Sequence, residues 1–534
     1  MDYKKLFKEL SEIRQPVWIF FVLTLFLTTA FFINFQTLDI YDPDSFYHIR
    51  HSWLLRENGI FNTDFPWTQY SMIKELGADL WYGFHLLLMP FTFFDDLTLG
   101  IKFSGVFITF SVLSGLYIAF RNLKIRYSEF WPIFFVFLNY QMTLRMAMTR
   151  PHPLSLMLSI LIFSFLIRGS SWWVFIFSVI LAWIHSSLFW LPFVSAFFII
   201  LFKFLADRKI DWSKITALIG GIALGLLARP HPIGNLKLVY IQVIELYKVK
   251  GSILASTIGT ELQPPYWTGL GNVILPILIL LGVSFAILIK TALAREQIVK
   301  DKKIAILSSL SMVFVSILMF IDTRRAIDLI SVYAVMLSAS VLTYYLSKTR
   351  LDMSSERSRI MVFLALLFTF FTMYNSVRIF QKTEIPRAIK RLRFEGPAVW
   401  LRDNTHPGDI VFHPQWDQFP SLFFWNQSNY FINGMDPIFL YKYRPDLYWK
   451  IYYITRKDMA GLTCGVENCG PDDNIELVYD VLVNDFKASY VFTRRLSNPR
   501  FLEYLEADTG HFKKVYDQEL SVIFKILLNS GAKK

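Results

Sequence analysis

Three aspartates lie close together directly after the first long apolar segment of the chain. They are Asp39, Asp42 and Asp44, and the uncharged run before them extends from Pro16 to Phe35. About 20 apolar residues are enough for a helix to cross a bilayer, so the cluster should lie where that helix meets water. Carboxylates at such a position are costly unless they are solvated, paired or bound to a cation. The pattern therefore indicates either a cation-dependent site at one membrane face or a solvated acidic loop.

Two later segments place a histidine between prolines and beside an arginine. They read Arg150-Pro151-His152-Pro153 and Arg229-Pro230-His231-Pro232. Proline disfavours helix at its own position and at the residue before it, so we expect a short stiff connector in each case. His152 could bind a divalent transition metal. The alternative is a Pro-rich helix boundary whose arginine extends to the membrane interface.

One acidic residue, Glu261, lies among small and apolar residues in the long stretch between residues 230 and 270. Loops of that length with no structure of their own are usually functional or mobile. Glu261 is therefore expected either to complete a cation site that is distant in sequence or to be an ordinary exposed glutamate.

Arg324 and Arg325 are adjacent between two apolar runs, and Asp322 and Asp328 flank them. These arginines are expected on the outer side of the membrane, where basic residues are less frequent than on the inner side. We therefore expect them to have an anionic partner. A guanidinium fork suits phosphate or pyrophosphate. Pairing with the two aspartates is the alternative interpretation.

The elements that must position these residues are membrane helices. The chain has 534 residues, of which 54% are hydrophobic and 17% aromatic, which is above a soluble average. Further apolar runs lie at about 98–120, 130–144, 153–167, 172–190, 191–205, 215–228, 271–289, 304–321, 326–346 and 360–380. The stretch Leu80–Phe94 is short and fits an interfacial helix. We therefore predict an α-helical polytopic membrane protein with about 11 transmembrane helices.

Basic residues give the orientation of these helices, because cytoplasmic loops of membrane proteins are enriched in Lys and Arg. Alternate loops are basic, beginning with the N-terminal segment that contains Lys4, Lys5, Lys8 and Arg14. The N-terminus is therefore expected to be cytoplasmic, and the six histidines before residue 400 then fall on the outer side. The net charge of +12 follows the inner loops, and no aromatic-basic module accompanies it, so nucleic acid is not an expected partner.

The last part of the chain mixes charged and aromatic residues with turn signals and short β-like runs. About 150 residues are enough for one small domain. We therefore expect a membrane domain at 1–381 and an extracytoplasmic α/β domain at 382–534. Cys464 and Cys469 have four residues between them and could form a disulfide on an oxidising side of the membrane. A metal site would need more ligands than these cysteines offer.

Taken in order, these segments resemble the catalytic subunit of oligosaccharyltransferase and, more broadly, the GT-C class of membrane glycosyltransferases. That family has an aspartate in a D-P-x-x-x-Y-x-x-R-like context in its first outer loop, and a similar segment here is Asp42-Pro43-Asp44-Ser45-Phe46-Tyr47-His48-Ile49-Arg50. Its long outer loop has a T-I-x-E-like motif, which resembles, with one extra residue, Thr257-Ile258-Gly259-Thr260-Glu261. Order and rough spacing match over residues 37–420.

The other motifs of that family are matched in part. Its pyrophosphate-binding arginine corresponds to Arg324 or Arg325. The acidic pair of its second outer loop is absent, and Arg150 and His152 stand in its place. Its W-W-D motif, which holds the acceptor sequon, corresponds to Gln415-Trp416-Asp417 with one tryptophan missing. A chain that kept the lipid-phosphate chemistry and changed its acceptor would have this pattern.

The resemblance implies an inverting transfer of a sugar or oligosaccharide from a polyprenyl phosphate or pyrophosphate donor at the outer face of the cell membrane. It assigns catalysis to Asp42 and Glu261, and a divalent metal, Mg²⁺ or Mn²⁺, to Asp42, Asp44, His152 and Glu261. Donor phosphate binding is assigned to Arg324, Arg325 and Arg150, and acceptor binding to Trp416 and Asp417. The implied partners are the lipid bilayer, the lipid-linked donor and a protein or glycan acceptor.

Three functions stay open on this basis. The first is an oligosaccharyltransferase-like enzyme that acts on protein, and the second is a GT-C transferase that acts on a glycan or lipid. The third is a transporter of lipid-linked sugars without chemistry, for which paired internal repeats with broken helices are expected. The sequence shows no convincing repeat beyond the two Arg-Pro-His-Pro segments.

Overall fold

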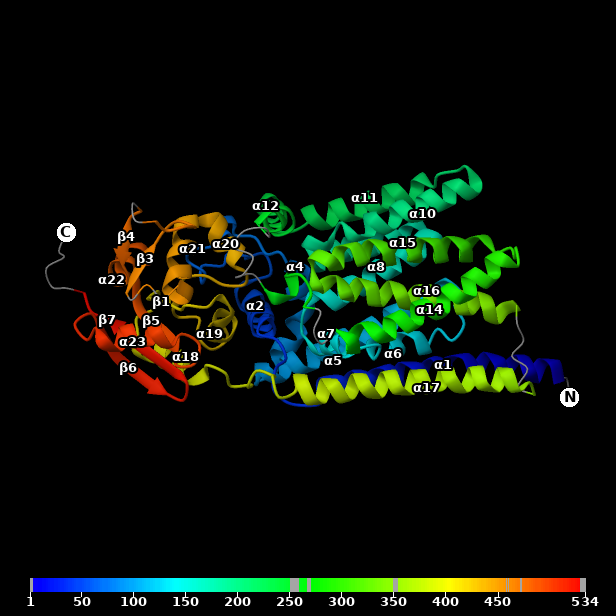
Figure 1. Ribbon diagram of the computed structural model, residues 1–534, viewed down its shortest axis with the longest axis horizontal. Coiled ribbons are helices and arrows are strands. Elements are labelled where there is room, and N and C mark those ends of the chain that lie inside the picture. The colour runs from blue at the N-terminus through cyan, green and yellow to red at the C-terminus, as the bar shows by residue number, and fades with distance from the viewer. Residues whose placement is uncertain are drawn as a thin grey trace. The chain divides into compact units, whose positions relative to one another are not determined.

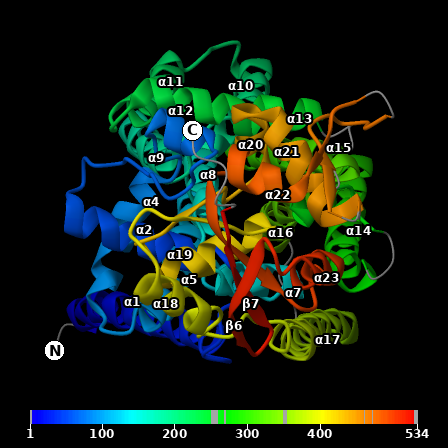
Figure 2. The same ribbon diagram turned by 90° about the vertical axis from the view of Figure 1, so that its left-hand side faces the viewer.

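The apolar runs of the sequence form helices in the computed structural model, which describes residues 3–249, 259–266, 270–348, 354–457, 459, 461–470 and 473–528. The chain divides into two compact units. Unit 1 comprises Met1–Tyr41, Thr98–Leu226 and Glu261–Ala388, and unit 2 comprises Asp42–Leu97, Leu227–Thr260 and Ile389–Lys534. Figures 1 and 2 show the long helices of the first unit and the short helices and strands of the second.

Unit 1 consists of helices, most of them long and apolar (Figure 1). They are α1 (Tyr3–Asn34), α5 (Leu97–Asn122), α6 (Phe130–Val136), α7 (Tyr140–Ala147), α8 (Pro151–Ile167), α9 (Ser171–Ile184), α10 (Leu191–Asp207), α11 (Trp212–Leu227), α14 (Gly271–Leu293), α15 (Lys300–Asp322), α16 (Ile327–Lys348) and α17 (Glu356–Ile379). Within the described residues, seven helices are long and apolar enough to cross a membrane, or nine if two bent helix pairs each form one span. The predicted class, a helical polytopic membrane protein, is confirmed.

Two of the predicted crossings are interrupted or short. The run at 130–144 forms two short helices because Asn139 caps the start of α7, where its side chain accepts a hydrogen bond from the N–H of Met142 at 3.1 Å. The run at 172–190 gives α9, whose 14 residues are too few to span a bilayer. These breaks contribute to the difference between the 11 predicted helices and the seven to nine spans.

The segment around His152 forms a sharp bend rather than the stiff connector that the prolines predict. α7 and α8 meet at an angle of 110°. Arg150 is extended at φ −131° and ψ 154°, the conformation that a following proline favours, and Pro151 begins α8. Proline is tolerated in the first turn of a helix because the N–H it lacks would have no partner there. His152 therefore lies in the first turn of α8.

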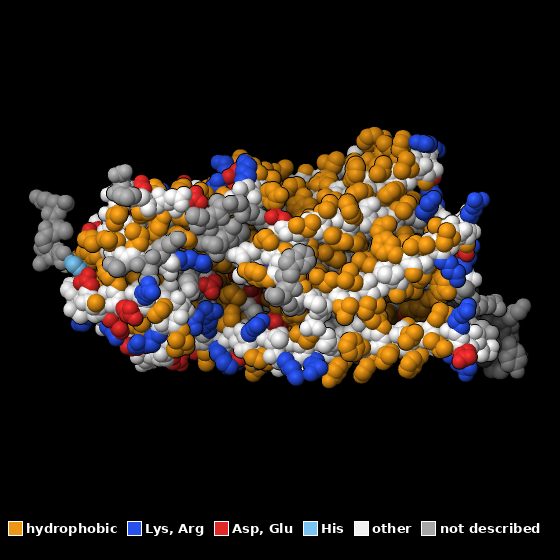
Figure 3. All heavy atoms as spheres, in the orientation of Figure 1, with side chains coloured by type: hydrophobic (Ala, Val, Ile, Leu, Met, Phe, Trp, Pro, Cys, Tyr) orange, Lys and Arg blue, Asp and Glu red, His pale blue; other side chains and the backbone are white. Residues whose placement is uncertain are grey.

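The helices of unit 1 differ in how much of their surface is buried. In the most apolar 18-residue stretch of each span, 94% of the residues are buried in the helix that contains α16 and 11% in the one that contains α17. Phe363, Leu366 and Phe370 of α17 are exposed, and Figure 3 shows apolar side chains over the surface of these helices, with Lys and Arg near their ends. Apolar surface of this extent is stable in lipid rather than in water. The chain is therefore a multi-pass membrane protein.

Unit 2 contains a five-stranded sheet with the strand order β2-β1-β5-β7-β6. The strands are β1 (Ile410–Phe412), β2 (Tyr430–Phe431), β5 (Ala488–Arg494), β6 (Phe512–Gln518) and β7 (Ser521–Ile526). The helices are α2 (Asp44–Asn58), α3 (Met72–Leu76), α4 (Tyr82–Leu88), α12 (Pro232–Tyr240), α13 (Leu246–Val249), α18 (Glu395–Asn404), α19 (Phe419–Trp425), α20 (Pro437–Tyr443), α21 (Pro445–Tyr452), α22 (Val478–Asp480) and α23 (Pro499–Ala507). β1 is parallel to β2 and β5, whereas β7 is antiparallel to β5 and β6. This confirms the predicted α/β part of the fold.

The β2 edge of the sheet is covered by a segment from early in the chain. The backbone of Phe431 accepts a hydrogen bond from the N–H of Gln69 and donates one to the carbonyl of Trp67, both at 2.8 Å. The indole N–H of Trp67 donates to the carbonyl of Gln427 at 2.9 Å. These contacts explain why residues 42–97 belong to the same unit as the C-terminal sheet.

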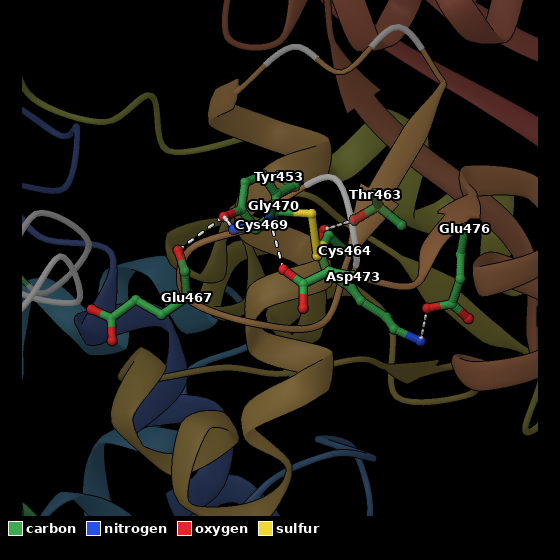
Figure 4. Close-up of a disulfide and its surroundings, with 9 residues drawn as sticks. Tyr453, Thr463, Cys464, Glu467, Cys469, Gly470, Asp473 and Glu476 are labelled. Carbon is green, nitrogen blue, oxygen red and sulfur yellow. Dashed lines mark hydrogen bonds and ion pairs between the residues drawn. A yellow bond between two sulfur atoms is a disulfide. The ribbon is translucent and has the colours of Figure 1, made fainter.

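Cys464 and Cys469 form the disulfide that their spacing allows. Cys464 ends β3 (Leu462–Cys464), which pairs with β4 (Ile475–Leu477) in antiparallel fashion. Figure 4 shows Tyr453 beside the bridge, where its hydroxyl donates to the carbonyl of Glu467 at 2.9 Å and accepts from the N–H of Cys469 at 3.0 Å. The disulfide and the tyrosine together fix the loop that follows β3.

Candidate functional site

Three arginines of unit 1 converge on the carboxylate of Glu261. Arg145 Nη1 lies 2.7 Å from Oε2, and Arg150 Nη1 and Arg325 Nη1 lie 3.2 and 3.1 Å from Oε1. The bend between α7 and α8 brings Arg145 and Arg150 together. Arg325 comes from the 3₁₀ turn Arg324–Ala326 that precedes α16. Residues distant in sequence therefore meet around one acidic side chain.

A second carboxylate, Asp328, holds the same group together. Its Oδ2 lies 3.0 Å from Nε of Arg145 and 2.9 Å from Nε2 of His152. Asp328 is fully buried in the first turn of α16, where the helix dipole favours negative charge. The other oxygen of Asp328 and Nδ1 of His152 are buried and have no hydrogen-bond partner among the residues that the structure describes. Both atoms can therefore still bond to a ligand or to water.

Arg324 adds a fourth guanidinium group to this region. It lies over the ring of Tyr266, with its carbon 4.4 Å from the ring centroid. Its Nε and Nη2 are buried without a hydrogen-bond partner in the described part of the chain. Its backbone N–H donates to the carbonyl of Gln263 at 2.9 Å, which ties this turn to the segment that follows Glu261.

We call Arg145, Arg150, Arg324 and Arg325 the arginine cluster. Its four positive charges exceed the two negative charges of Glu261 and Asp328. Burial raises the pKa of Glu261, but the three guanidinium groups beside it, that of Arg325 first, outweigh burial and hold this pKa well below its usual range. Glu261 therefore stays ionised. Guanidinium groups gathered in this way suit an anionic ligand such as phosphate.

The structure places the predicted site residues in two units. Those in unit 1 are Arg150, His152, Glu261, Arg324 and Arg325, and they lie within the group just described. Those in unit 2 are Asp42, Asp44, Trp416 and Asp417. Thr257 and Ile258 of the T-I-x-E-like motif lie outside the described residues.

The predicted residues of unit 2 lie at the starts of helices. Asp44 begins α2, and Asp42, two residues earlier, is buried. Trp416 and Asp417 form part of the 3₁₀ turn before α19, and Oδ2 of Asp417 lies 4.0 Å from Nη2 of Arg393. The roles assigned to these residues stay predictions.

The side chains of unit 1 fit an anion better than a cation. Both oxygens of Glu261 face guanidinium groups, and Nε2 of His152 faces Asp328. A metal ion placed there would be repelled by three arginines at close range. The metal roles of Glu261 and His152 therefore stay predictions.

Another group of residues, in unit 2, has the composition of a metal site. Asp79 Oδ2 lies 2.5 Å from Nδ1 of His85 and 3.9 Å from Nε2 of His51. The three residues each offer one ligand atom, and these atoms lie within 4.8 Å of one another. All three residues are buried. In the described part of the chain, this is the one group of three or more His, Cys, Asp or Glu with such spacing.

Burial and the neighbouring charges set the protonation of this group. Burial is the main cause that lowers the pKa of His51 to about 3. Burial raises the pKa of Asp79, but His85, His51 and the N–H of Trp81 outweigh it and lower this pKa to about 2. At neutral pH the group therefore contains a neutral His51 and an ionised Asp79.

A cavity of 630 Å³ in unit 2 combines aromatic and charged side chains. It is lined by residues that include Arg50, Trp53, Arg56, Phe424 and Trp425. The guanidinium of Arg50 lies between two rings, 4.9 Å from the centroid of Trp53 and 5.0 Å from that of Phe424. Its Nε is buried without a hydrogen-bond partner among the described residues. A planar cation between aromatic faces can hold a polar ligand with an apolar side.

Sequence reasoning missed Arg145 and the His51–Asp79–His85 group as site residues. Asp328 was considered as a partner of the Arg324–Arg325 pair, whereas its contacts are with Arg145 and His152. One signal was present for His51, which follows Tyr47 by four residues and so shares a helix face with it. No spacing rule links Arg145 to Glu261, because the two residues meet through the bend between α7 and α8.

Comparison with known proteins identifies the fold. No family model and no curated protein matches the sequence. Membrane helices followed by a C-terminal α/β unit form the architecture of the GT-C glycosyltransferases, and solved structures of that class match nearly the whole chain. Identities of 9–14% show a shared fold.

Three solved structures illustrate the match. The archaeal oligosaccharyltransferase AglB from Archaeoglobus fulgidus, in complex with an inhibitory peptide and a dolichol-phosphate, gives a TM-score of 0.60 at 10% identity, over 97% of this chain and 75% of that one. ArnT from Cupriavidus metallidurans in the apo state gives a TM-score of 0.54 at 10% identity, over 96% of this chain and 98% of that one. The mycobacterial arabinofuranosyltransferase AftD gives a TM-score of 0.52 at 14% identity, over 96% of this chain and 42% of that one. ArnT has also been solved with undecaprenyl phosphate, and AglB with Zn and sulfate.

Proposed function

We propose that this protein is a membrane glycosyltransferase that uses a polyprenyl-phosphate-linked sugar, and that the arginine cluster binds the phosphate of this donor. The observation that carries the proposal is the convergence of three guanidinium groups on Glu261 in a GT-C fold. Relatives of that fold have been solved with dolichol-phosphate and with undecaprenyl phosphate. A lipid phosphate combines an anion with an apolar tail, which suits arginines on turns beside membrane helices.

The arginine cluster would assist departure of the lipid phosphate. The phosphate oxygen gains negative charge as its bond to the sugar breaks, so fixed guanidinium groups stabilise the transition state more than the ground state. Arg145, Arg150 and Arg325 would exchange contacts with Glu261 for contacts with phosphate oxygens. Asp328 would keep Arg145 in place during this exchange, because it binds Nε and leaves the outer nitrogens of the guanidinium for the ligand.

Acceptor activation is proposed for Asp42, which follows the first membrane helix in the sequence. A carboxylate there can accept the proton of the attacking group. A divalent metal such as Mg²⁺ or Mn²⁺ is proposed for the carboxylates of Asp42 and Asp44, where it would supply positive charge for the reaction. The arginines around Glu261 and the contact of His152 with Asp328 count against these two residues as further ligands. Oxygen donors are the ligands these ions prefer. We propose that the reaction takes place at the outer face, with the N-terminus cytoplasmic and the C-terminal domain outside.

The acceptor is proposed to be a protein, by analogy with oligosaccharyltransferase, with Trp416 and Asp417 in contact with the peptide. A glycan or lipid acceptor is the second candidate. One observation favours it: the cavity beside Arg50 combines aromatic faces with a forked donor, which suits a sugar ring.

The test is a transfer assay on the purified full-length protein in detergent. The protein is given a pooled lipid-linked sugar extract, a divalent metal and a labelled peptide that contains an N-x-Thr sequon. Asp42→Ala serves as the inactive control. A metal-dependent glycopeptide that the variant fails to make would support transfer to protein.

Two other outcomes separate the alternatives. Cleavage of the lipid donor without a glycopeptide would keep the donor site and favour a glycan or lipid acceptor. If neither product forms while the protein still binds the lipid donor, the glycosyltransferase proposal fails and a transporter of lipid-linked sugars becomes the better explanation.

A further inference from the structure

We propose that His51, Asp79 and His85 bind one transition-metal ion of the Zn²⁺ or Co²⁺ type in unit 2. This site is additional to the Mg²⁺ or Mn²⁺ proposed for catalysis, and its existence does not depend on the glycosyltransferase function. The three residues are drawn from α2, from the loop before α4 and from α4 itself. An ion at this point would therefore tie α2 to α4.

The donor atoms define the kind of metal. Two imidazole nitrogens and one carboxylate oxygen form the ligand set of many zinc sites, which leave a fourth position for water. Imidazole suits Zn²⁺, Co²⁺ and related ions, whereas Mg²⁺ prefers oxygen donors alone and keeps several waters. Among the described residues, no third imidazole or carboxylate completes this ligand set.

The surroundings hold each ligand in a suitable orientation. Nε2 of His85 lies 2.8 Å from Nδ1 of His48, and Nδ1 of His51 lies 2.9 Å from the hydroxyl of Tyr47. The second oxygen of Asp79 accepts a hydrogen bond from the N–H of Trp81 at 2.9 Å. Histidines that bind metals usually use their other ring nitrogen in this way, which fixes the ring and its tautomer.

Small movements would convert the observed contacts into a coordination sphere. Bonds of about 2.0–2.2 Å in tetrahedral geometry place neighbouring ligand atoms about 3.3 Å apart. The contact of Asp79 with His85 is 2.5 Å and that with His51 is 3.9 Å. The distance from Asp79 to His85 must therefore lengthen, and that to His51 must shorten, each by less than about 1 Å. Side-chain rotation can supply such movements. The metal would take the place of the direct contact between Nδ1 of His85 and Oδ2 of Asp79.

The competing explanation is a buried hydrogen-bond network without metal. His48, His85 and Asp79 already form a continuous chain of contacts. A network of this kind would not respond to chelators or to added metal. Metal content and metal-dependent stability therefore distinguish the two explanations.

The experiment measures zinc on the purified full-length protein in detergent. The protein is stripped with a chelator, reloaded with Zn²⁺ and desalted, and metal is counted by mass spectrometry. We expect about one Zn²⁺ per chain. The thermal midpoint should fall on chelation and recover with Zn²⁺ or Co²⁺ but not with Mg²⁺. Bound Co²⁺ should also give a visible absorption band.

Two variants and one control complete the test. Asp79→Asn keeps the size of the side chain and its contact with Trp81, and should bind Zn²⁺ at least about tenfold more weakly. The double variant His51→Ala with His85→Ala should hold none. His511→Ala, a partly exposed histidine of unit 2 that pairs with Asp508, should bind as the wild type does.

Three results would overturn the proposal. They are a reloaded wild type without zinc, an Asp79→Asn variant that binds zinc as tightly as the wild type, and a wild-type thermal midpoint that a chelator does not change. If the double variant does not fold, Asp79→Asn and the chelation experiment still decide. Loss of the zinc site would leave the donor-binding proposal standing, because phosphate binding is measured separately.

Discussion

Replacing Arg325 with alanine should weaken the binding of a polyprenyl phosphate. Arg325 contributes Nη1 to the group around Glu261 at 3.1 Å, and its side chain is 25% exposed, so it is largely removed from water. In the proposed complex this nitrogen would bind a phosphate oxygen instead. Because the alanine side chain offers neither charge nor donor, one charge-assisted contact is lost.

The size of the effect follows from that contact. A hydrogen bond to a charged group contributes about 1.5–3 kcal/mol, and each 1.4 kcal/mol is a factor of about ten in affinity. Removal of Arg325 should therefore raise the dissociation constant about 10- to 150-fold. The lower half of this range is expected because Arg145 and Arg150 remain beside the phosphate. Arg325→Lys should lie between the wild type and the alanine variant, since it keeps the charge and loses the fork.

The measurement is a titration of the detergent-solubilised protein with undecaprenyl phosphate at fixed, moderate salt, because salt screens exposed charges. The matched control is Arg444→Ala, which removes an exposed arginine of unit 2 that pairs with Asp446. Size-exclusion chromatography of each variant checks that it is folded.

The reasoning would be refuted if Arg325→Ala bound the lipid phosphate as tightly as the wild type. Equal losses in Arg325→Ala and Arg444→Ala would also refute it, because the effect would then come from net charge. Equal affinities of the lysine variant and the wild type would exclude a role for the guanidinium fork and leave a role for charge.

Four further predictions follow from the same structure. Glu261→Gln should tighten lipid-phosphate binding about tenfold in the same titration, because it removes a negative charge beside three arginines. Since the pKa of Glu261 is held well below its usual range, lowering the pH of the wild type from about 7 to 5 should not reproduce this gain. Asp42→Ala should abolish sugar transfer in the assay above while donor binding stays within about twofold. Cys464→Ser should lower the free energy of unfolding of unit 2 by at most about 2 kcal/mol in denaturant, and a reductant should have the same effect on the wild type. Phe412→Ala, at a fully buried position of β1, should cost about 3–5 kcal/mol in the same measurement.

The fold class could be read from the sequence because it depends on local patterns. Runs of about 20 apolar residues give spans wherever they occur, and α5, α14, α15, α16 and α17 lie where these runs lie. The number of membrane-spanning helices was harder to predict because one polar residue can end a helix. Asn139 divides an apolar run into two short helices through a single cap.

The site could be predicted in part. The Arg324–Arg325 pair was expected to meet an anion, and the structure places Glu261 against Arg325. The contribution of Arg145 was missed because it depends on a 110° bend between two helices. The role of Asp79 depends on a loop that brings it to His51 and His85, and tertiary contacts of this kind leave no periodic signal in the sequence.

The covered edge of strand β2 has a consequence for the order in which the protein is made. Backbone bonds to Phe431 come from Trp67 and Gln69, which are translated some 360 residues earlier. The segment that contains Trp67 and Gln69 therefore cannot form these bonds until β2 has been translated. Contacts of such high sequence separation form late in folding. A fragment that begins at residue 389 would expose the backbone groups of β2, and an open strand edge promotes aggregation. Soluble expression of the C-terminal domain should therefore require residues 42–97, supplied in the same chain or as a second polypeptide.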